Sequence, residues 1–172
     1  NDFYQGGILM NFLDKTSDAL LRLDKFTAFL TVGDSKSVNP MTIGWASFGI
    51  ACGKPVLSVM IRQSRFSKQL IDSNPVFTVS IPRDGSYKAA LGICGSKSGR
   101  DADKMALCSL KEQKADVNGI SGIENCLMYE CKVIYKTEME EGSTVPAMNA
   151  KWYKDGNYHT IYTGEILNIK GE

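Results

Sequence analysis

Residues 127–135 read Leu-Met-Tyr-Glu-Cys-Lys-Val-Ile-Tyr, and they carry the clearest two-residue period in the chain. Successive side chains of a β-strand point to opposite faces of a sheet, so a period of two indicates a strand. One face would carry Leu127, Tyr129, Cys131, Val133 and Tyr135. The stretch therefore predicts a long strand with one buried face.

Five further segments are rich in β-branched and aromatic residues and are bounded by turn formers, which is typical of strands. They are residues 26–33, 43–51, 56–62, 76–81 and 158–169. Gly164 interrupts the last of them and is expected to form a β-bulge. Polar segments at 34–40 and 109–125 are predicted to be loops, and residues 138–156 a mobile insertion.

Short helices are predicted between some of these strands. They span residues 16–23, 66–72, 87–91 and 98–108. The last prediction rests on Ser98 and Asp101, whose spacing matches a capping box. Six strands with few intervening helices do not fit the regular alternation of a doubly wound α/β fold. The sequence instead predicts a mainly β fold, a closed or nearly closed antiparallel Greek-key barrel with short helices outside it.

Length and composition limit the function further. A chain of 172 residues suits one domain spanning 1–172, of which residues 1–10 are expected to be flexible or foreign to the natural protein, with Met10 a candidate start. Twenty basic residues oppose nineteen acidic ones, so the chain has no bulk field for nucleic acid or an acidic membrane surface. Any anion site must be local.

Cellular setting and metal binding follow from cysteine, histidine and apolar content. Five cysteines and a single histidine, without metal-ligand spacing, argue against a zinc site and against a disulfide framework. No run of ~20 apolar residues and no basic-then-apolar leader is present in the sequence, so we expect a soluble cytoplasmic protein.

The common catalytic motifs are missing from the sequence. It contains no G-x-G-x-x-G fingerprint, no P-loop and no G-x-S-x-G elbow. These absences argue against a Rossmann dehydrogenase, an NTPase and a serine hydrolase.

Two serine-rich segments combine hydroxyls with cations near predicted helix starts, where backbone N–H groups attract anions. The first is Ser64-Arg65-Phe66-Ser67-Lys68, which suits a phosphate monoester. The second is the segment 96–104, with Lys104 about one and a half turns inside its helix. Ordinary capping with solvated cations remains an alternative for both segments.

A third feature is the segment 39–47, Asn-Pro-Met-Thr-Ile-Gly-Trp-Ala-Ser, in which small residues beside Trp45 would let a planar ligand lie against the backbone. Alternatively Trp45 is a core residue and Asn39-Pro40 a turn. His159, at the start of the last strand, is either a site residue or a surface or interface residue. The cysteines lack an adjacent base and are interpreted as small buried residues.

The order of these segments resembles that of the flavin reductase-like family, which includes flavoredoxins and NAD(P)H:FMN oxidoreductases of the FMN-binding split-barrel fold. The resemblance runs from about residue 26 to residue 169. It rests on Asn39 to Trp45, Arg62 to Ser67, the Cys-Gly-Ser-Lys-Ser-Gly-Arg-Asp stretch at 94–101, and Asp155 to Thr160 before Gly164-Glu165.

The resemblance implies FMN bound near the interface of a homodimer of split barrels. Asn39, Met41 and Thr42 would line the flavin, Trp45, Ala46 and Ser47 would flank its ring, and Ser64, Arg65 and Ser67 would hold its phosphate. Cys94 and Gly95 belong to the cofactor-binding motif, Ser98 and Lys104 would lie by the phosphate or ring edge, and His159 would face the isoalloxazine. Phe66 stands where the family usually has tyrosine, so a phenolic hydrogen bond is not expected there.

The implied activity is hydride transfer from NAD(P)H to flavin, with His159 and Lys104 as candidate catalytic residues. Lys104 would stabilise negative charge on the reduced ring. An FMN-carrying electron-transfer protein, reduced by one partner protein and passing electrons to another, is the alternative. A split-barrel protein that binds flavin without its own NAD(P)H activity, or that has lost flavin, is a third possibility.

Overall fold

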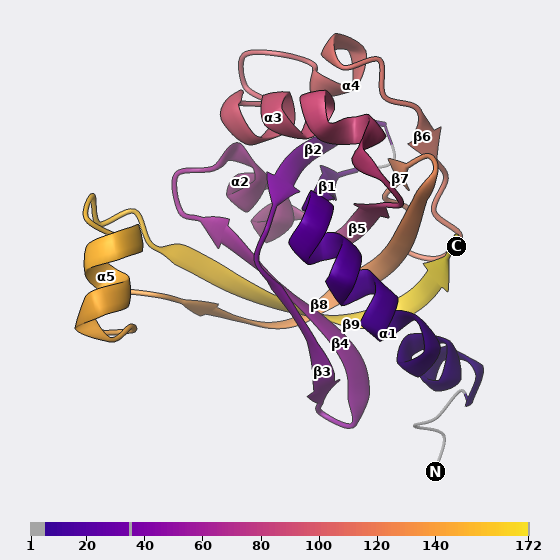
Figure 1. Ribbon diagram of the computed structural model, residues 1–172, viewed down its shortest axis with the longest axis horizontal. Helices are drawn as coiled ribbons and strands as arrows, with labels where there is room; N and C mark the ends of the chain where they lie inside the picture. Colours follow the sequence, from indigo (N-terminus) through magenta and orange to yellow (C-terminus); the bar gives the residue numbers. More distant parts are fainter. Residues whose placement is uncertain (1–5, 35, 172) are drawn as a thin grey trace.

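Seven of the strands in the described part of the chain form one antiparallel sheet in the order β2-β1-β5-β8-β9-β4-β3 (Figure 1). The protein is represented by a computed structural model that describes residues 6–34 and 36–171. The strands are β1 (Ala28–Gly33), β2 (Val38–Ile43), β3 (Ala46–Ala51), β4 (Lys54–Arg62), β5 (Val76–Pro82), β8 (Cys126–Glu138) and β9 (His159–Lys170). The mainly β, antiparallel class predicted from the sequence is confirmed.

The predicted strand at 43–51 is confirmed from residue 46 to residue 51 but wrong at its start, where β2 ends and the strand breaks before β3. β2 already begins at Val38 and ends at Ile43, and β3 begins at Ala46. β2 and β3 form the two opposite edges of the sheet, so the chain crosses from one edge to the other at Gly44-Trp45. Asn39 and Pro40 consequently belong to a strand and not to a turn.

β8 is buried more completely than its alternation predicts. All six residues from Cys126 to Cys131 are buried, on both faces of the strand. One face points into the main core, whereas the other is covered by the short hairpin of β6 (Glu112–Gln113) and β7 (Gly122–Ile123), which lies in the predicted 109–125 loop. The second half of β8 is mostly exposed.

Gly164 is required for close packing, and the β8–β9 bulges lie beside it. The register shifts between Glu130 and Cys131 and between Val133 and Tyr135, while Gly164 itself pairs with Val133. A Cβ at Gly164 would lie 2.6 Å from the Phe77 ring and 2.9 Å from the Cys131 Cβ. The glycine therefore lets β9 approach the core side chains of its neighbours.

The helices differ from their predicted lengths. They are α1 (Gly6–Phe26), α2 (Phe66–Ser73), a 3₁₀ turn at Gly85–Tyr87, α3 (Lys88–Ser96), α4 (Lys104–Leu107) and α5 (Pro146–Trp152). α1 is a 21-residue helix that already begins within the segment expected to be flexible, while residues 1–5 lie outside the described residues. α5 lies within the predicted mobile insertion, at the far end of the extended β8–β9 ribbon in Figure 1.

The predicted helix at 98–108 is wrong in its first half. α4 begins only at Lys104, where the Asp103 carboxylate accepts a hydrogen bond from the backbone N–H of Ala106. Ser98 instead accepts one from the backbone N–H of Arg100, two residues ahead, and so stabilises a turn. Lys104 is therefore the first residue of α4 instead of lying one and a half turns inside a helix.

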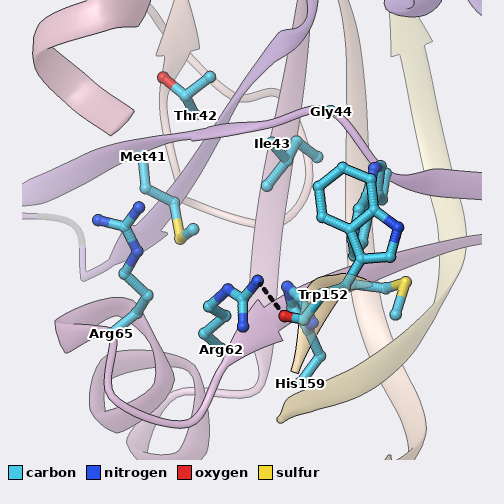
Figure 2. A pocket seen from close by; sticks show the side chains of 10 residues that line it. Met41, Thr42, Ile43, Gly44, Arg62, Arg65, Trp152 and His159 are labelled. Atoms are coloured by element: carbon cyan, nitrogen blue, oxygen red, sulfur yellow. Dashed lines mark hydrogen bonds between the residues drawn. The ribbon is translucent and has the colours of Figure 1, made fainter. Parts of the chain in front are cut away.

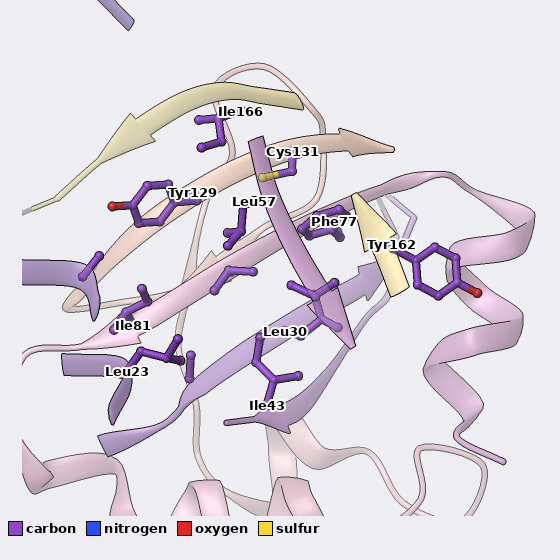
Figure 3. Close-up of a cluster of buried hydrophobic side chains, with 14 of the residues drawn as sticks. Leu23, Leu30, Ile43, Leu57, Phe77, Ile81, Tyr129, Cys131, Tyr162 and Ile166 are labelled. Atoms are coloured by element: carbon purple, nitrogen blue, oxygen red, sulfur yellow. The ribbon is translucent and has the colours of Figure 1, made fainter. Parts of the chain in front are cut away.

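The main core lies inside the curved sheet, and α1 packs against it from one side (Figure 3). It contains Leu30, Leu57, Ile81 and Tyr129, and α1 contributes Leu23 to it. A second, smaller cluster lies beneath α3 and includes Phe29, Leu91, Cys94, Ile123 and Cys126. Together the two clusters fix β1, β2 and α3 relative to one another, and residues of β2 and of the end of α3 line the site.

Candidate functional site

A groove with two connected parts runs beside β2. Both parts are lined by Met41, Arg62 and Arg65. The first part, here called the aromatic end, is also lined by Thr42, Ile43, Gly44, Trp45, Met60, Trp152 and His159 (Figure 2). The second part, here called the serine-rich end, is also lined by Asn39, Ser64, Phe66, Ser67, Ser96, Lys97, Ser98, Gly99, Arg100, Lys104 and Asn157.

The start of α2 faces the serine-rich end. Ser67 is 2% exposed, and its hydroxyl accepts a hydrogen bond of 2.9 Å from the Asn39 side-chain amide. The first N–H groups of any helix lack intrahelical acceptors, and the helix dipole adds partial positive charge there. In α2 those groups belong to Phe66 and Ser67, so this end of the groove presents N–H and O–H donors to an anion.

One half-buried and one buried cation, Arg65 and Lys104, reinforce this donor set. The Arg65 guanidinium donates to the backbone carbonyl of Gly95, and this contact fixes the arginine against α3. Lys104 is only 4% exposed, and burial lowers the pKa of its ammonium. Neither cation has a carboxylate partner among the described residues, and no described Asp or Glu lines either end of the groove.

The turn between α3 and α4 closes over the serine-rich end. A Cβ at Gly99 would lie 2.0 Å from the side-chain oxygen of Asn39 and 3.1 Å from the Phe66 ring, so only glycine allows this approach. The Arg100 guanidinium lies over the Phe66 ring at 5.0 Å. The turn thus brings Ser98 and Arg100 to the start of α2, more than 30 residues earlier in the sequence.

Aromatic rings form the other end of the groove. Trp45 meets the Trp152 ring edge-on, with centroids 4.9 Å apart, and its centroid lies 5.2 Å from that of His159. The Nδ1 atom of His159 lies 2.8 Å from the Tyr153 hydroxyl. Burial, followed by the charges of Arg62 and Arg65, lowers the pKa of His159 to about 4. His159 is therefore a neutral hydrogen-bonding group at pH 7.

Arg62 connects the groove to α5, and the sequence did not single it out as a site residue. Its guanidinium donates to the backbone carbonyl of Asn157 at 2.6 Å. It also donates to that of Trp152 at 3.1 Å, which is the contact drawn in Figure 2. Asn157 in turn donates to the Ser64 hydroxyl at 2.9 Å. The sequence feature that could have identified Arg62 as a site residue is its position at the end of a strand, three residues before Arg65. Nothing local to the sequence indicated Trp152.

Most residues predicted for the site lie together in the groove. They are Asn39, Met41, Thr42, Trp45, Ser64, Arg65, Phe66, Ser67, Ser98, Lys104 and His159. The two candidate catalytic residues lie apart, because Lys104 lines the serine-rich end and His159 the aromatic end.

Four predicted residues are not among the described residues that line the groove. Ala46 and Ser47 lie on β3, beyond Trp45, because the strand break at Gly44 turns the chain away. Cys94 lies on the buried face of α3, and burial raises the pKa of its thiol to about 12. Gly95 supports the groove from behind, through its carbonyl contact with Arg65 and by packing against Thr42.

Comparison with known proteins agrees with this architecture. Residues 20–172 match the family described as flavin reductase like domain. A curated relative, uncharacterized protein YddH of Escherichia coli, is 28% identical over 119 residues, which are 67% of this chain and 62% of that protein. The matched part thus spans less than two thirds of the relative. In the described part of the chain, no helix is long and apolar enough to cross a bilayer.

Three solved structures share the fold. Flavoredoxin from Methanosarcina acetivorans superposes with a TM-score of 0.65 at 24% identity, covering 85% of this chain and 68% of that one. An FMN-binding protein from Thermus thermophilus gives 0.65 at 20% identity, with coverages of 86% and 70%. The NADH:FAD oxidoreductase SgcE6 of Streptomyces globisporus gives 0.64 at 19% identity, with coverages of 86% and 75%. The family match spans most of the chain and these folds agree with it, so the chain belongs to the flavin reductase-like domain family.

Proposed function

We propose that this protein binds FMN in the groove and transfers a hydride from NAD(P)H to the flavin. The proposal rests on one observation, that the two chemically different ends of the groove lie next to each other. A donor-rich, carboxylate-free end shares Met41, Arg62 and Arg65 with an end walled by Trp45, Trp152 and His159. FMN has the same division, because one end of the molecule is a phosphate monoester and the other is a planar ring.

The serine-rich end fits the phosphate. A phosphate monoester carries about −1.5 to −2 charges at pH 7 and offers three acceptor oxygens. Arg65 and Lys104 supply two positive charges, and neither is neutralised by a described carboxylate. The hydroxyls of Ser64 and Ser67 and the first N–H groups of α2 supply neutral donors. We assign Lys104 to phosphate binding, because it lines this end and not the aromatic end.

The aromatic end fits a flat ring. Trp45 and Met41 provide apolar surface, and the neutral His159 imidazole provides a hydrogen-bonding group whose orientation is fixed by Tyr153. Bound FMN would supply the redox chemistry, by accepting a hydride and passing electrons to an acceptor. The residues of this chain bind and orient the ring, and His159 offers a hydrogen bond without changing its charge near pH 7. Because the sequence lacks a dinucleotide motif, we expect the nicotinamide to bind there by stacking.

The visible spectrum of the purified protein tests this proposal. We expect absorption bands of oxidised flavin, either as purified or after FMN is added and the excess removed. Anaerobic addition of NADH or NADPH should then bleach those bands within the time of enzymatic turnover. A protein that retains no FMN, or whose bound FMN is not reduced by either nucleotide, would contradict the enzyme assignment.

The fold shared with flavoredoxin from Methanosarcina acetivorans favours a second candidate, an electron carrier. A carrier would hold FMN tightly, accept electrons from one protein and pass them to another. It would show the bands of bound flavin but only slow bleaching by NAD(P)H. The same anaerobic experiment therefore separates the two functions.

We also propose that the protein is a homodimer with FMN near the interface. The ribbon that carries α5 projects from the sheet (Figure 1), and it exposes Tyr135, Val145 and Met148. Large apolar side chains gathered on a projecting arm are typical of surfaces that are covered by a partner. Analytical ultracentrifugation at micromolar concentration should give twice the mass of the chain, and a monomer at all concentrations would contradict the proposal.

A further inference from the structure

The serine-rich end holds more positive charge than one phosphate requires. Arg65 and Lys104 already match the charge of a phosphate monoester of about −2. Three more cations line this end. The Arg62 guanidinium is held by the carbonyls of Asn157 and Trp152, whereas Lys97 and Arg100 are exposed on the turn between α3 and α4. Two cations at the rim therefore remain after the phosphate of FMN is balanced.

Surface cations are usually paired with carboxylates, but Lys97 and Arg100 are not paired with a described one. Neither Lys97 nor Arg100 forms an ion pair with any described residue. Of the neighbouring acids, Asp103 is engaged in capping α4, and Asp101 does not line the groove. Lys97 gains some stabilisation from the end of α3, but that contribution is only about 0.3–1 kcal/mol at an exposed site.

The rim is also held in place. The Arg100 guanidinium lies over the Phe66 ring, and the Arg100 backbone N–H donates to the Ser98 hydroxyl at 3.1 Å. Gly99 packs so closely against Asn39 that the turn cannot take a side chain at this position. A guanidinium that is positioned before a ligand arrives loses less conformational entropy when it binds one.

We propose that Lys97 and Arg100 form a second phosphate subsite at the rim of the groove, so that the protein favours ligands that bring a further phosphate group to this rim. This inference rests on the proposed function for the first phosphate. The second phosphate has two sources, the pyrophosphate of FAD and the 2′-phosphate of NADPH. Dinucleotide-binding sites for NADH commonly hold the ribose hydroxyl with a carboxylate, whereas sites for NADPH place an arginine beside the 2′-phosphate.

The decisive variant is Lys97→Ala/Arg100→Ala, and Lys111→Ala/Lys114→Ala is the matched control. Lys111 and Lys114 are exposed, lie outside the groove lining and carry the same total charge. Affinities of the wild type and both variants would be measured for riboflavin, FMN and FAD by flavin fluorescence. Affinities for 5′-AMP and adenosine 2′,5′-bisphosphate would be measured by calorimetry at the same ionic strength. Thermal melting checks that each variant is folded.

We expect the rim variant to lose about tenfold in affinity for one of the ligands with two phosphates, while FMN affinity changes less than about threefold. A loss confined to FAD identifies the pyrophosphate. A loss confined to the bisphosphate identifies the 2′-phosphate of the dinucleotide, and should appear as a raised KM for NADPH but not for NADH. The control should leave all affinities unchanged.

Two results would overturn the subsite. One is unchanged affinity for FAD and for the bisphosphate, and the other is an FMN loss as large as the loss for either of them, since the rim would then serve a single phosphate. Failure of the proposed function is distinguishable, because it appears as wild-type protein that binds neither riboflavin nor FMN. The comparison of the two adenosine phosphates needs no flavin and would still decide for or against a 2′-phosphate at the subsite.

Discussion

Lys104 should stabilise the ligand-bound protein and destabilise the free one. Its side chain is 4% exposed, burial lowers the pKa of the ammonium, and no described carboxylate neutralises it. A buried charge without a partner costs stability, and it is retained where it serves a ligand. Lys104→Met keeps the length and the apolar contacts of the stem but removes the charge.

The two effects of Lys104→Met have opposite signs. Removing the buried charge should raise the free energy of unfolding of the free protein by about 1 kcal/mol, or about 2–4 °C in Tm for a chain of this size. Losing a charged hydrogen bond to the phosphate should cost about 1.5–3 kcal/mol of FMN affinity, which is about 10- to 150-fold. Riboflavin, which has no phosphate, should bind the variant and the wild type equally.

Thermal melting without ligand and flavin fluorescence titration with FMN and riboflavin measure both effects. Lys111→Met is the control, since Lys111 is exposed and should change neither quantity. A Lys104→Met protein that melts lower than the wild type and binds FMN as tightly would refute the reasoning, because Lys104 would then be a structural residue.

Three further predictions concern the site and the fold. The pKa of His159 is lowered from 6.5 to about 4, so the stability linked to its neutral form is complete above pH 6.5 and falls by about 3 kcal/mol towards pH 4. His159→Gln should therefore make Tm depend less on pH between pH 6.5 and pH 4, and an unchanged pH dependence of Tm would speak against a neutral buried imidazole. Glu130 is fully buried and accepts hydrogen bonds from the backbone N–H groups of residues 116–118. Glu130→Gln should lower the free energy of unfolding in urea by about 2–3 kcal/mol, and equal urea midpoints for variant and wild type would argue against a stabilising role of these hydrogen bonds. Gly164→Ala would place its Cβ 2.6 Å from the Phe77 ring and should lower the free energy of unfolding in urea by about 1–3 kcal/mol. Gly49→Ala, with open space around its Cβ, is the control, and similar losses of stability in both variants would show that crowding is not the cause.

Strands with a local pattern could be predicted from the sequence, but the break between β2 and β3 could not. β8 and β9 carry their own periodicity and turn residues, which depend only on neighbours in the chain. The break at Gly44-Trp45 follows from the need to join the two edges of the sheet. Gly44 is a local strand breaker, but residues on both sides favour strands, so this glycine alone does not show that the chain crosses between edges.

The error at Ser98 has a local physical cause. A serine hydroxyl can accept from the N–H groups of a helix start or from an N–H two residues ahead in a turn, and both occur with similar spacing. Here it accepts from Arg100, and Asp103 takes the capping role instead. The sequence contained both candidates, and tertiary contact of Gly99 with Asn39 accompanies the turn.

The serine-rich end of the groove was easier to predict than the aromatic end. Ser64, Arg65 and Ser67 are adjacent in the sequence, so a single strand-to-helix junction positions all three. The aromatic end depends on α5, which Arg62 holds through the Trp152 carbonyl across 90 residues. A long-range contact of this kind leaves no periodicity or spacing in the sequence.

The most direct test of phosphate recognition is the ratio of FMN to riboflavin affinity in the wild type and in Arg65→Ala/Ser67→Ala. The two ligands share a ring and differ by the phosphate, so the ratio isolates the serine-rich end. We predict that the wild type favours FMN by at least about tenfold and that the variant brings the ratio towards one, with riboflavin affinity unchanged. Equal binding of the two flavins by the wild type, or a ratio that the substitutions do not alter, would contradict the assignment of this groove.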